Sequence, residues 1–386
     1  MVENKKVLIV NCHANGYGVV SSLCNKRKDD YFIIVCDPNK NCASFKSKYV
    51  DRAVLVPQIN TNEEEFLNTI ISIGKEYDQK IYLIPTNDTY LIAFQRNWSR
   101  LQEYFIPVFE LDADILKTCM DKKEMYVLAE KAGVPYPKSF YHSSEIRSDD
   151  VFPVIVKPLM KTADNFLKIP FRIKKFNSRK DLELGEKLFH NVDIDYVIQQ
   201  YIPGNDDQLY TGGTVSISGK IYGIGTGRKI RQYPANLGIC AYGELVKDEK
   251  LEYYTRKFVN HAKISGISQV EFKKYNGDYY LMEINPRPWL WNRLITFGGV
   301  NLPHIYIKAL EKPDMSEVKQ NKFEGYYSAS INDLIYNVKN GDSVSFLSWL
   351  KQVLTADIYS LGSRKDPLPG LYNIINHIPI IRKFRK

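Results

Sequence analysis

The chain has 386 residues, of which 44% are hydrophobic and 25% are charged, and its formal net charge is +9 at pH 7. This size and composition are typical of a globular protein with two or three packed subdomains, and no run of 18 or more apolar residues predicts a membrane span. The positive charge favours an anionic partner such as a nucleotide, a sugar nucleotide, an acidic polymer or a membrane surface. No basic stripe interleaved with aromatic residues predicts nucleic-acid binding.

The first strand begins close to Met1, so we expect no secretory signal and a cytoplasmic protein. The six cysteines show no metal-binding spacing, and we expect free thiols.

Residues 5–115 alternate strand and helix patterns, which predicts a parallel α/β sheet. The expected strands are Val7–Val10, Tyr31–Cys36, Ala53–Val56 and Ile81–Ile84, with a helix over Asn62–Tyr77.

Two turns in this region lie where ligands of such sheets gather. The turn at residues 15–18, Asn-Gly-Tyr-Gly, could hold an anion at a helix start. It lacks the third glycine of a dinucleotide fingerprint, with Asp37 the one acid in place, so a tight turn without a ligand is favoured. Asp88 follows another strand end and is equally typical of a helix cap.

The middle of the chain contains a helix that opens at residues 121–123, Asp-Lys-Lys, and ends at Gly133. An apolar strand over Val151–Val156 follows and ends at Lys157. A second apolar strand covers residues 196–202 and leads into an Asp-Asp pair.

A basic segment, Thr226–Pro234, follows two strands joined at Ser218-Gly219. We interpret it as a loop or, if extended, as a strand with Lys229 and Arg231 on one face. Arg228 is the third cation. Because three neighbouring cations repel one another, anions are expected nearby, and phosphate and a substrate carboxylate are the obvious ones.

The most informative stretch is a hairpin over residues 269–288, whose strands meet at Asn276-Gly277, a strong turn signal. Alternation separates the acidic face from the apolar face. It predicts Val270 and Phe272 opposite in direction to Glu271, and Met282 and Ile284 opposite in direction to Glu283 and Asn285.

This hairpin gathers Glu271, Glu283 and Asn285. Two carboxylates and an amide oxygen are hard donors that suit Mg²⁺, which also keeps water and phosphate oxygens as ligands. Arg287 follows at once, placed to meet developing negative charge.

The order of these motifs resembles the ATP-grasp superfamily over roughly residues 5–312. That superfamily includes D-alanine–D-alanine ligase, carbamoyl-phosphate synthetase and biotin carboxylase. Residues 227–234 and the helix that starts at residues 291–293, Trp-Asn-Arg, look most like the D-aspartate-ligase-type carboxylate–amine ligases.

The resemblance implies an α/β ATP-grasp fold in four parts. These are an N-terminal parallel α/β domain (1–114), a small lobe (115–200), a large lobe with the metal site (201–312) and a C-terminal helical extension with a basic tail (313–386).

The resemblance also implies roles for single residues. Lys122 and Lys157 would bind ATP phosphates, and Asp206 or Asp207 would accept from the ribose. The strand Gln199, Gln200, Tyr201 and Ile202 would line the adenine. The hairpin donors Glu271, Glu283 and Asn285 would hold two Mg²⁺ ions, with Mn²⁺ as the alternative metal. Arg287, with Arg228, Lys229 or Arg231, would steady an acyl-phosphate.

Two features depart from the superfamily pattern. Gln199 stands where an acid is usual, so backbone carbonyls alone would hold the adenine amine. The loop of residues 159–165, glycine-rich in many relatives, has no glycine here; Lys161 would supply charge in place of backbone amides, and the segment could still act as a lid.

The implied function is ATP-dependent amide formation between a carboxylate and an amine through an acyl-phosphate. A cell-wall or surface-polysaccharide precursor, nucleotide-linked or lipid-linked, is the expected substrate. One alternative is an enzyme like carbamoyl-phosphate synthetase or a carboxylase. The other is a nucleotide-binding regulatory protein without turnover. Neither the substrates' identities nor the oligomeric state follows from the sequence.

Residues 313–386 predict short helices and a tail, 370–386, that holds six Leu and Ile residues and ends in a basic segment, 382–386, with no acid after Asp366. Either a helix docks on the core with a frayed basic end, or a basic amphipathic element touches the inner face of an anionic membrane.

Overall fold

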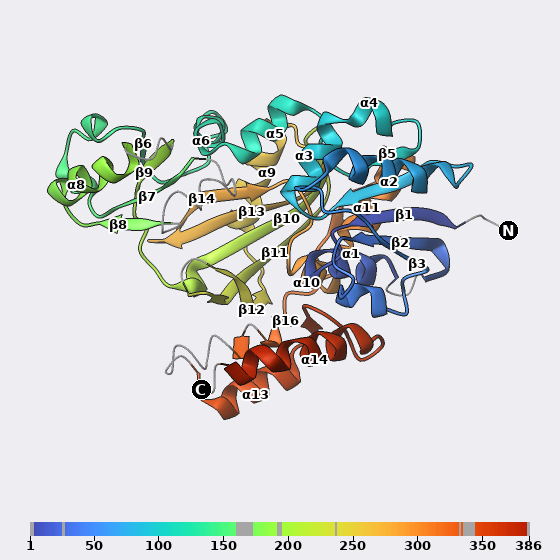
Figure 1. Cartoon of the computed structure of the whole chain (residues 1–386). Coiled ribbons are helices and arrows are strands. Elements are labelled where there is room, and N and C mark those ends of the chain that lie inside the picture. Colours follow the sequence, from blue (N-terminus) through green and yellow to red (C-terminus); the bar gives the residue numbers. More distant parts are fainter. Residues whose placement is uncertain are drawn as a thin grey trace.

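The computed structural model describes residues 4–24, 28–159, 173–190, 195–235, 238–331, 333–334 and 344–383. Two predicted features lie partly outside this part of the chain. They are the lid at 159–165, of which only Leu159 is described, and the basic tail, which is described up to residue 383. The described residues form three sheets, with the largest between the other two (Figure 1).

The N-terminal sheet is parallel, in the order β3-β2-β1-β4-β5, as the sequence predicts. Its strands are β1 (Lys5–Val10), β2 (Tyr31–Asp37), β3 (Arg52–Leu55), β4 (Ile81–Pro85) and β5 (Phe105–Pro107). Its helices are α1 (Ala14–Cys24), α2 (Glu63–Lys75), α3 (Asp88–Arg96) and α4 (Trp98–Leu101), with 3₁₀ turns η1 (Lys28–Asp30) and η2 (Ala43–Lys46).

Local chemistry explains the helix starts in this domain. The side chain of Asn62 caps α2 by accepting from Glu65 N, and acids fill its first turn, where they suit the helix dipole. At α3 the cap is Asn87, which accepts from Thr89 N. Of the two alternatives left open for Asp88, the helix cap was therefore wrong, and its carboxylate accepts from Arg287 instead.

The small lobe holds a four-stranded sheet in the order β6-β9-β7-β8. Its elements are α5 (Ala113–Met120), α6 (Lys122–Lys131), β6 (Ser139–Phe140), η3 (Ser143–Glu145), η4 (Asp149–Val151), β7 (Val154–Pro158), β8 (Lys174–Phe176), α8 (Arg179–His190) and β9 (Tyr196–Gln200). The predicted strand over Val151–Val156 was wrong at its start, because a 3₁₀ turn occupies Val151. α6 begins at Lys122, within the predicted helix opening at 121–123, and Asp121 caps it by accepting from Lys123 N and Glu124 N.

The main sheet runs β14-β13-β10-β11-β12-β16-β17, and β15 also pairs with β11. After η5 (Asp206–Gln208), its strands are β10 (Leu209–Ile217), β11 (Lys220–Tyr233), β12 (Ile239–Leu245), β13 (Gly266–Tyr275), β14 (Asp278–Asn285), β15 (Val318–Lys319), β16 (Tyr326–Ser328) and β17 (Ile358–Tyr359). The basic segment lies in β11, a 14-residue strand, so its prediction as a loop was wrong.

A shared hydrophobic core joins the N-terminal domain to the main sheet. The helices α9 (Glu249–Ala262), α10 (Asn292–Phe297) and α11 (Leu302–Glu311) pack beside that sheet. Val7 and Val19 of the first domain lie in one buried cluster with Trp291, Ile295 and Ile305. Burial of this apolar surface fixes the two domains relative to each other, and the candidate site depends on that arrangement.

The C-terminal region contributes strands as well as helices, contrary to the prediction of short helices alone. It adds β15, β16 and β17 to the main sheet and then forms α13 (Phe346–Thr355) and α14 (Leu368–Lys383), which lie at one side of the molecule (Figure 1). Tyr372 of α14 donates to Asn41 Oδ1 (3.2 Å), and Lys46 lies over its ring. This contact supports the docked arrangement for the start of α14.

No helix in the described part of the chain is both long enough and apolar enough to cross a membrane.

Candidate active site

The predicted acidic hairpin is formed by β13 and β14. The turn residues Asn276 and Gly277 have φ of 50° and 77°, the left-handed conformation that a tight Asn-Gly turn requires. The register places Glu271 directly opposite Glu283. Cβ atoms of directly opposed residues lie about 5 Å apart, so the two carboxylates share one side of the hairpin.

A bulge between Glu271 and Phe272 changes one detail of the predicted faces. Phe272 pairs with Leu281, which leaves Met282 as the extra residue of the bulged strand. Leu281 is fully buried in the same cluster as Ile284. The prediction that Met282 shares the apolar face with Ile284 was therefore wrong, because a bulge interrupts the two-residue period.

Lys229 of β11 forms a buried ion pair with Glu271, two strands away across β10. Both residues are less than 10% exposed. Burial lowers the pKa of the Lys229 ammonium, but the carboxylates of Glu271 and Glu283 outweigh it and the pKa is raised overall. The ammonium thus neutralises the acidic hairpin from the middle of the sheet.

The other two cations of β11 also have carboxylate partners. Arg228 Nε donates to Glu244 Oε1 (2.5 Å), and Arg231 donates to both oxygens of the buried Asp333 (2.8 and 2.7 Å). The argument that phosphate and substrate must balance these charges was therefore wrong, because the protein itself supplies the anions. The catalytic roles of Arg228, Lys229 and Arg231 remain predictions.

Arg287 connects the hairpin to the N-terminal domain. Its Nε and Nη2 donate to the two oxygens of Asp88 (2.7 and 3.1 Å), and Nη2 also lies 3.3 Å from Asn285 Oδ1. The role of Arg287 toward a developing negative charge stays a prediction. The structure adds that its guanidinium is held by Asp88 at the start of α3.

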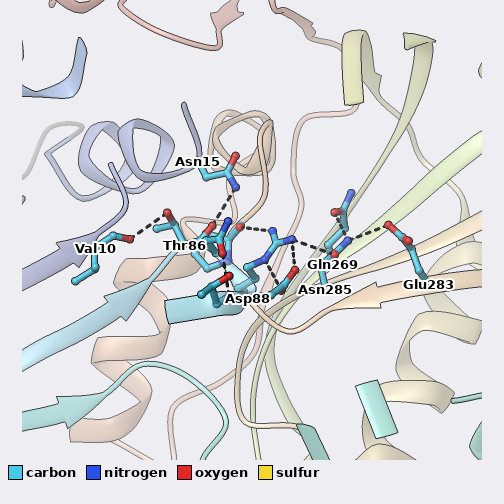
Figure 2. Close-up of polar contacts among 11 residues, drawn as sticks. Val10, Asn15, Thr86, Asp88, Gln269, Glu283 and Asn285 are labelled. Atoms are coloured by element: carbon cyan, nitrogen blue, oxygen red, sulfur yellow. Dashed lines mark hydrogen bonds and ion pairs between the residues drawn. The ribbon is translucent and has the colours of Figure 1, made fainter. Parts of the chain in front are cut away.

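The polar contacts continue in both directions from this pair (Figure 2). On one side Asn15 donates to Thr86 O (3.0 Å). The prediction of a turn at residues 15–18 was wrong, because α1 begins at Ala14 and contains these residues. On the other side Asn285 Nδ2 donates to Gln269 Oε1 (3.1 Å) and lies 3.4 Å from Glu283 Oε1. A chain of polar side chains therefore runs from the first domain to the acidic hairpin.

The two predicted phosphate-binding lysines, Lys122 and Lys157, are each only 7% exposed. Lys122 Nζ donates to Leu159 O (3.3 Å), two residues beyond Lys157. On the same helix, Tyr126 donates to Met282 O in β14 (3.3 Å), and burial together with the charge of Glu283 raises the pKa of the Tyr126 phenol. α6 thus links the buried lysines of the small lobe to the acidic hairpin.

The predicted adenine strand has one unusual side chain. Gln199 is fully buried, and its Nε2 donates to Ser139 Oγ (2.9 Å). Within the described residues its Oε1 has no hydrogen-bond partner. The backbone N–H groups of Gln200 and Tyr201 donate to Lys138 O and Pro153 O (2.8 and 3.0 Å). These two hydrogen bonds hold the strand in place. The side-chain carbonyl of Gln199 is different, because a buried oxygen without a hydrogen-bond partner lowers the stability of the fold.

Asp206 and Asp207 differ in their surroundings. Asp206 is buried, and its carboxylate accepts from both the backbone N and Nε2 of Gln232 (3.0 and 2.9 Å). Asp207 accepts from the neighbouring Gln208 Nε2 (3.3 Å). Because Asp206 already ties η5 to β11, Asp207 is the better ribose candidate.

The donor set fits Mg²⁺ on chemical grounds. In the described part of the chain no three His, Cys, Asp or Glu residues converge as an all-protein metal cage. Glu271, Glu283 and Asn285 instead offer two carboxylates and one amide. Mg²⁺ is commonly bound by one or two carboxylates with water and substrate phosphates completing its octahedron.

Several residues of the site escaped sequence reasoning. Gln269 relays the contacts between Asn285 and Glu271, to which its Nε2 lies 3.4 Å. It stands two positions before Glu271, so strand alternation alone could have placed it on the acidic face. The contact of Tyr126 with Met282 and the pair of Asp88 with Arg287 join residues far apart in the sequence. No short sequence pattern predicts such contacts.

The sequence is similar to those of several known ligases and synthases. No family model matches the chain. Among curated proteins it is 24% identical over 260 residues to D-aspartate ligase of Enterococcus faecium, a match that covers 61% of each protein. It is 23% identical over 310 residues to the large chain of carbamoyl phosphate synthase of Clostridium perfringens, covering 74% of this chain and 27% of that one. The chain thus matches less than two thirds of the length of these relatives.

Solved structures give the fold. The L-amino acid ligase of Bacillus licheniformis superposes with a TM-score of 0.54 at 16% identity, covering 81% of this chain and 75% of that one. The biotin carboxylase domain of the Hydrogenobacter thermophilus 2-oxoglutarate carboxylase, in complex with MgADP and bicarbonate, gives 0.61 at 16% identity, covering 83% and 73%. The chain has the ATP-grasp fold that these proteins share, and the predicted resemblance is confirmed.

The pairing of Arg231 predicts a loss of stability when it is removed. Arg231→Ala would remove the ion pair with the buried carboxylate of Asp333 and both of its hydrogen bonds, at a cost of about 3–5 kcal/mol. Urea unfolding should show this loss, and Arg231→Ala/Asp333→Ala should recover part of it. Arg228→Ala is the matched control, because its ion pair is partly exposed and costs about 1 kcal/mol or less.

The double variant also separates structure from catalysis. If Arg231 acts only through Asp333, activity per folded molecule returns in the double variant. If Arg231 also meets substrate, that activity stays low. An unchanged unfolding free energy in Arg231→Ala would contradict the structural role.

Proposed function

We propose that the chain is an ATP-dependent carboxylate–amine ligase that forms an amide bond through an acyl-phosphate. The observation that carries the proposal is the opposed pair Glu271 and Glu283, neutralised by Lys229 and linked through Tyr126 to the helix that starts at Lys122. This arrangement suits a metal-bound polyphosphate between the two lobes.

The reaction balances in two steps. A carboxylate oxygen attacks the γ-phosphorus of ATP, the bond between that phosphorus and the β,γ-bridging oxygen breaks, and ADP leaves with the electron pair. The amine nitrogen then attacks the acyl carbon, the amide forms, and phosphate leaves with one oxygen of the former carboxylate. The amine gives up its proton in the process.

The side chains of the protein supply charge and alignment for these steps. Lys122 and Lys157 would bind the phosphates as compact cations, and Arg287 would steady the charge that develops on the acyl-phosphate. Bound Mg²⁺, held by Glu271, Glu283 and Asn285, would supply charge neutralisation on the phosphate oxygens. No nucleophilic side chain is needed, because the substrate carboxylate is itself the nucleophile.

Adenine would lie against the strand Gln199–Ile202. The buried Oε1 of Gln199, without a partner in the described residues, offers an acceptor for the exocyclic amine of adenine. Asp207 would accept from the ribose hydroxyls. This extends the expectation from sequence, in which backbone carbonyls alone hold that amine.

The substrate class is proposed as a small carboxylate and an amine, with a cell-wall or surface-polysaccharide precursor as the larger of the two. The similarity to D-aspartate ligase supports an amino-acid substrate. Hydroxylamine can replace the unknown amine, because it converts an acyl-phosphate to a hydroxamate. We therefore expect hydroxamate to form in step with ADP when the protein is screened against D- and L-amino acids and uronic acids.

The alternatives predict different products. A carboxylase-like or carbamoyl-phosphate-forming enzyme would release ADP with bicarbonate and give no amino-acid hydroxamate. A regulatory protein would bind ATP and release no ADP with any substrate pool. The Lys229–Glu271 ion pair is compatible with either function, so product analysis decides between them.

A cytoplasmic protein in contact with the inner membrane face is the proposed location. Leu368, Leu371 and Ile375 of α14 are 56%, 53% and 61% exposed, and the sequence after Asp366 has no acid. Exposed apolar side chains next to a basic segment suit an anionic lipid surface. Such a location would bring the site to lipid-linked precursors.

Glu283→Gln should abolish most ATP turnover and leave the fold intact. The amide cannot neutralise a metal, and the hydrogen-bonded neighbours of Glu283 remain. We expect ADP release to fall more than tenfold, a rise of more than about 1.4 kcal/mol in the activation free energy, with an unchanged circular dichroism spectrum. Glu252→Gln, on the outer face of α9, is the matched control; a Glu283 variant as active as that control would sink the metal assignment.

Lys157→Ala should weaken ATP binding far more than Lys123→Ala. Lys157 is buried in β7, whereas Lys123 is exposed and lies 5.0 Å from the ring of Tyr141. Loss of one phosphate contact by a buried cation is expected to cost about tenfold or more in affinity. Calorimetric titration of ATP into both variants measures this difference, and equal affinities would show that Lys157 does not meet the phosphates.

A further inference from the structure

A second pocket lies away from the candidate active site, where three distant segments of the chain meet. Its volume is about 340 Å³. The first domain contributes Ser21 and Tyr49, α10 contributes Arg293 and Thr296, and the C-terminal region contributes residues 355–359 and 363–365. None of the residues proposed to bind ATP or metal lines it.

The lining is strongly cationic. Arg293, Arg364 and Lys365 all border the pocket, and Asp357 is the one acid among the lining residues. Asp357 is exposed, and its carboxylate accepts a hydrogen bond from Tyr326 N (3.0 Å). Within the described residues none of the three cations has a carboxylate partner in an ion pair, in contrast to the three cations of β11.

Arg293 is the most constrained of the three. Its Nη1 donates to Gly362 O (3.0 Å), and its guanidinium lies 5.6 Å from the ring centre of Tyr17. Gly362 has φ of 77°, a left-handed conformation that favours glycine and sets the turn that meets Arg293. Burial lowers the pKa of Arg293, and its electrostatic interactions with Tyr17, Tyr49 and Asp366 only partly offset this.

Asp366 balances the charge of Arg293 only in part, because its oxygens are engaged by other groups. It is 1% exposed, and its Oδ2 accepts from Tyr17 Oη (3.1 Å) and Ser47 Oγ (2.6 Å). Its Oδ1 accepts from the backbone N of Lys48 (3.1 Å). These contacts hold the carboxylate against the first domain, so the guanidinium of Arg293 keeps donors for a ligand.

We propose that this pocket is a second anion site, which binds a phosphate monoester or diester through Arg293, Arg364 and Lys365. Guanidinium groups pair with phosphate through two parallel hydrogen bonds, and partly buried cations gain most from such a partner. A volume of about 340 Å³ accommodates a phosphate with a small polar group attached. The ligand would tie the C-terminal region to the first domain and to α10.

Calorimetry with sn-glycerol 3-phosphate tests the proposal on the full chain saturated with ADP and Mg²⁺, so that the first phosphate site is filled. We expect one further equivalent to bind, and uncharged glycerol to give no binding. Arg364→Ser/Lys365→Ser, which changes two exposed residues, should weaken the affinity at least tenfold. Lys351→Ser, an exposed cation of α13 outside the pocket, is the matched control and should bind as wild type does.

Arg293→Gln is the second variant and should also weaken binding at least tenfold, provided that its melting temperature shows a folded protein. No binding to the wild type, or equal affinity in Arg364→Ser/Lys365→Ser and Lys351→Ser, overturns the proposal. This result does not depend on amide formation, so the ligase function and the anion site can fail separately.

Vesicles identify the source of the phosphate. A lipid headgroup is the ligand if the protein binds phosphatidylglycerol vesicles but not phosphatidylcholine vesicles. That binding should be lost in Arg364→Ser/Lys365→Ser, and glycerol 3-phosphate should compete with it. Binding of glycerol 3-phosphate without vesicle binding assigns the site to a free metabolite. Both results support a phosphate site. The proposal is contradicted if the wild type does not bind glycerol 3-phosphate and the double variant still binds the vesicles.

Discussion

The buried ion pair between Lys229 and Glu271 is the interaction on which the candidate site depends. Two carboxylates directly opposed on a hairpin repel each other, and inside a protein that repulsion is poorly screened. The ammonium of Lys229 lies against one of them and within range of the other. It holds β11 and β13 together across β10, so the charge balance of the site is built into the centre of the main sheet.

The same arrangement explains how the domains are held around the site. The apolar cluster of Val7, Trp291 and Ile295 fixes the first domain against the main sheet without directing any polar group. The pair of Arg287 with Asp88 supplies the direction, because a guanidinium that meets both carboxylate oxygens allows little rotation. A ligand that competes for Arg287 would therefore weaken its ion pair with Asp88 at the start of α3.

Much of this architecture follows from local sequence signals. Apolar runs bounded by turn residues predicted the parallel sheet of the first domain, and the Asn-Gly turn predicted the hairpin that gathers Glu271 and Glu283. The turn sets the register as far as Phe272 and Leu281, and the bulge beyond that pair places Glu271 directly opposite Glu283. The positions that reasoning missed depend on contacts far apart in the chain. The partners of Arg231 and Arg287 lie 102 and 199 residues away, and no local pattern indicates that a cation already has an anion. The bulge at Met282 also escaped, because the two-residue period of a strand does not indicate where an extra residue is inserted.

The central claim is that a carboxylate becomes an acyl-phosphate before an amine displaces it. The most direct test uses a carboxylate substrate labelled with ¹⁸O in both oxygens, with mass spectrometry of the released phosphate. The account predicts one ¹⁸O atom in each phosphate formed together with the amide. Phosphate without label, released alongside ADP and amide, would contradict it, because the oxygen could then not have passed from the carboxylate to phosphorus.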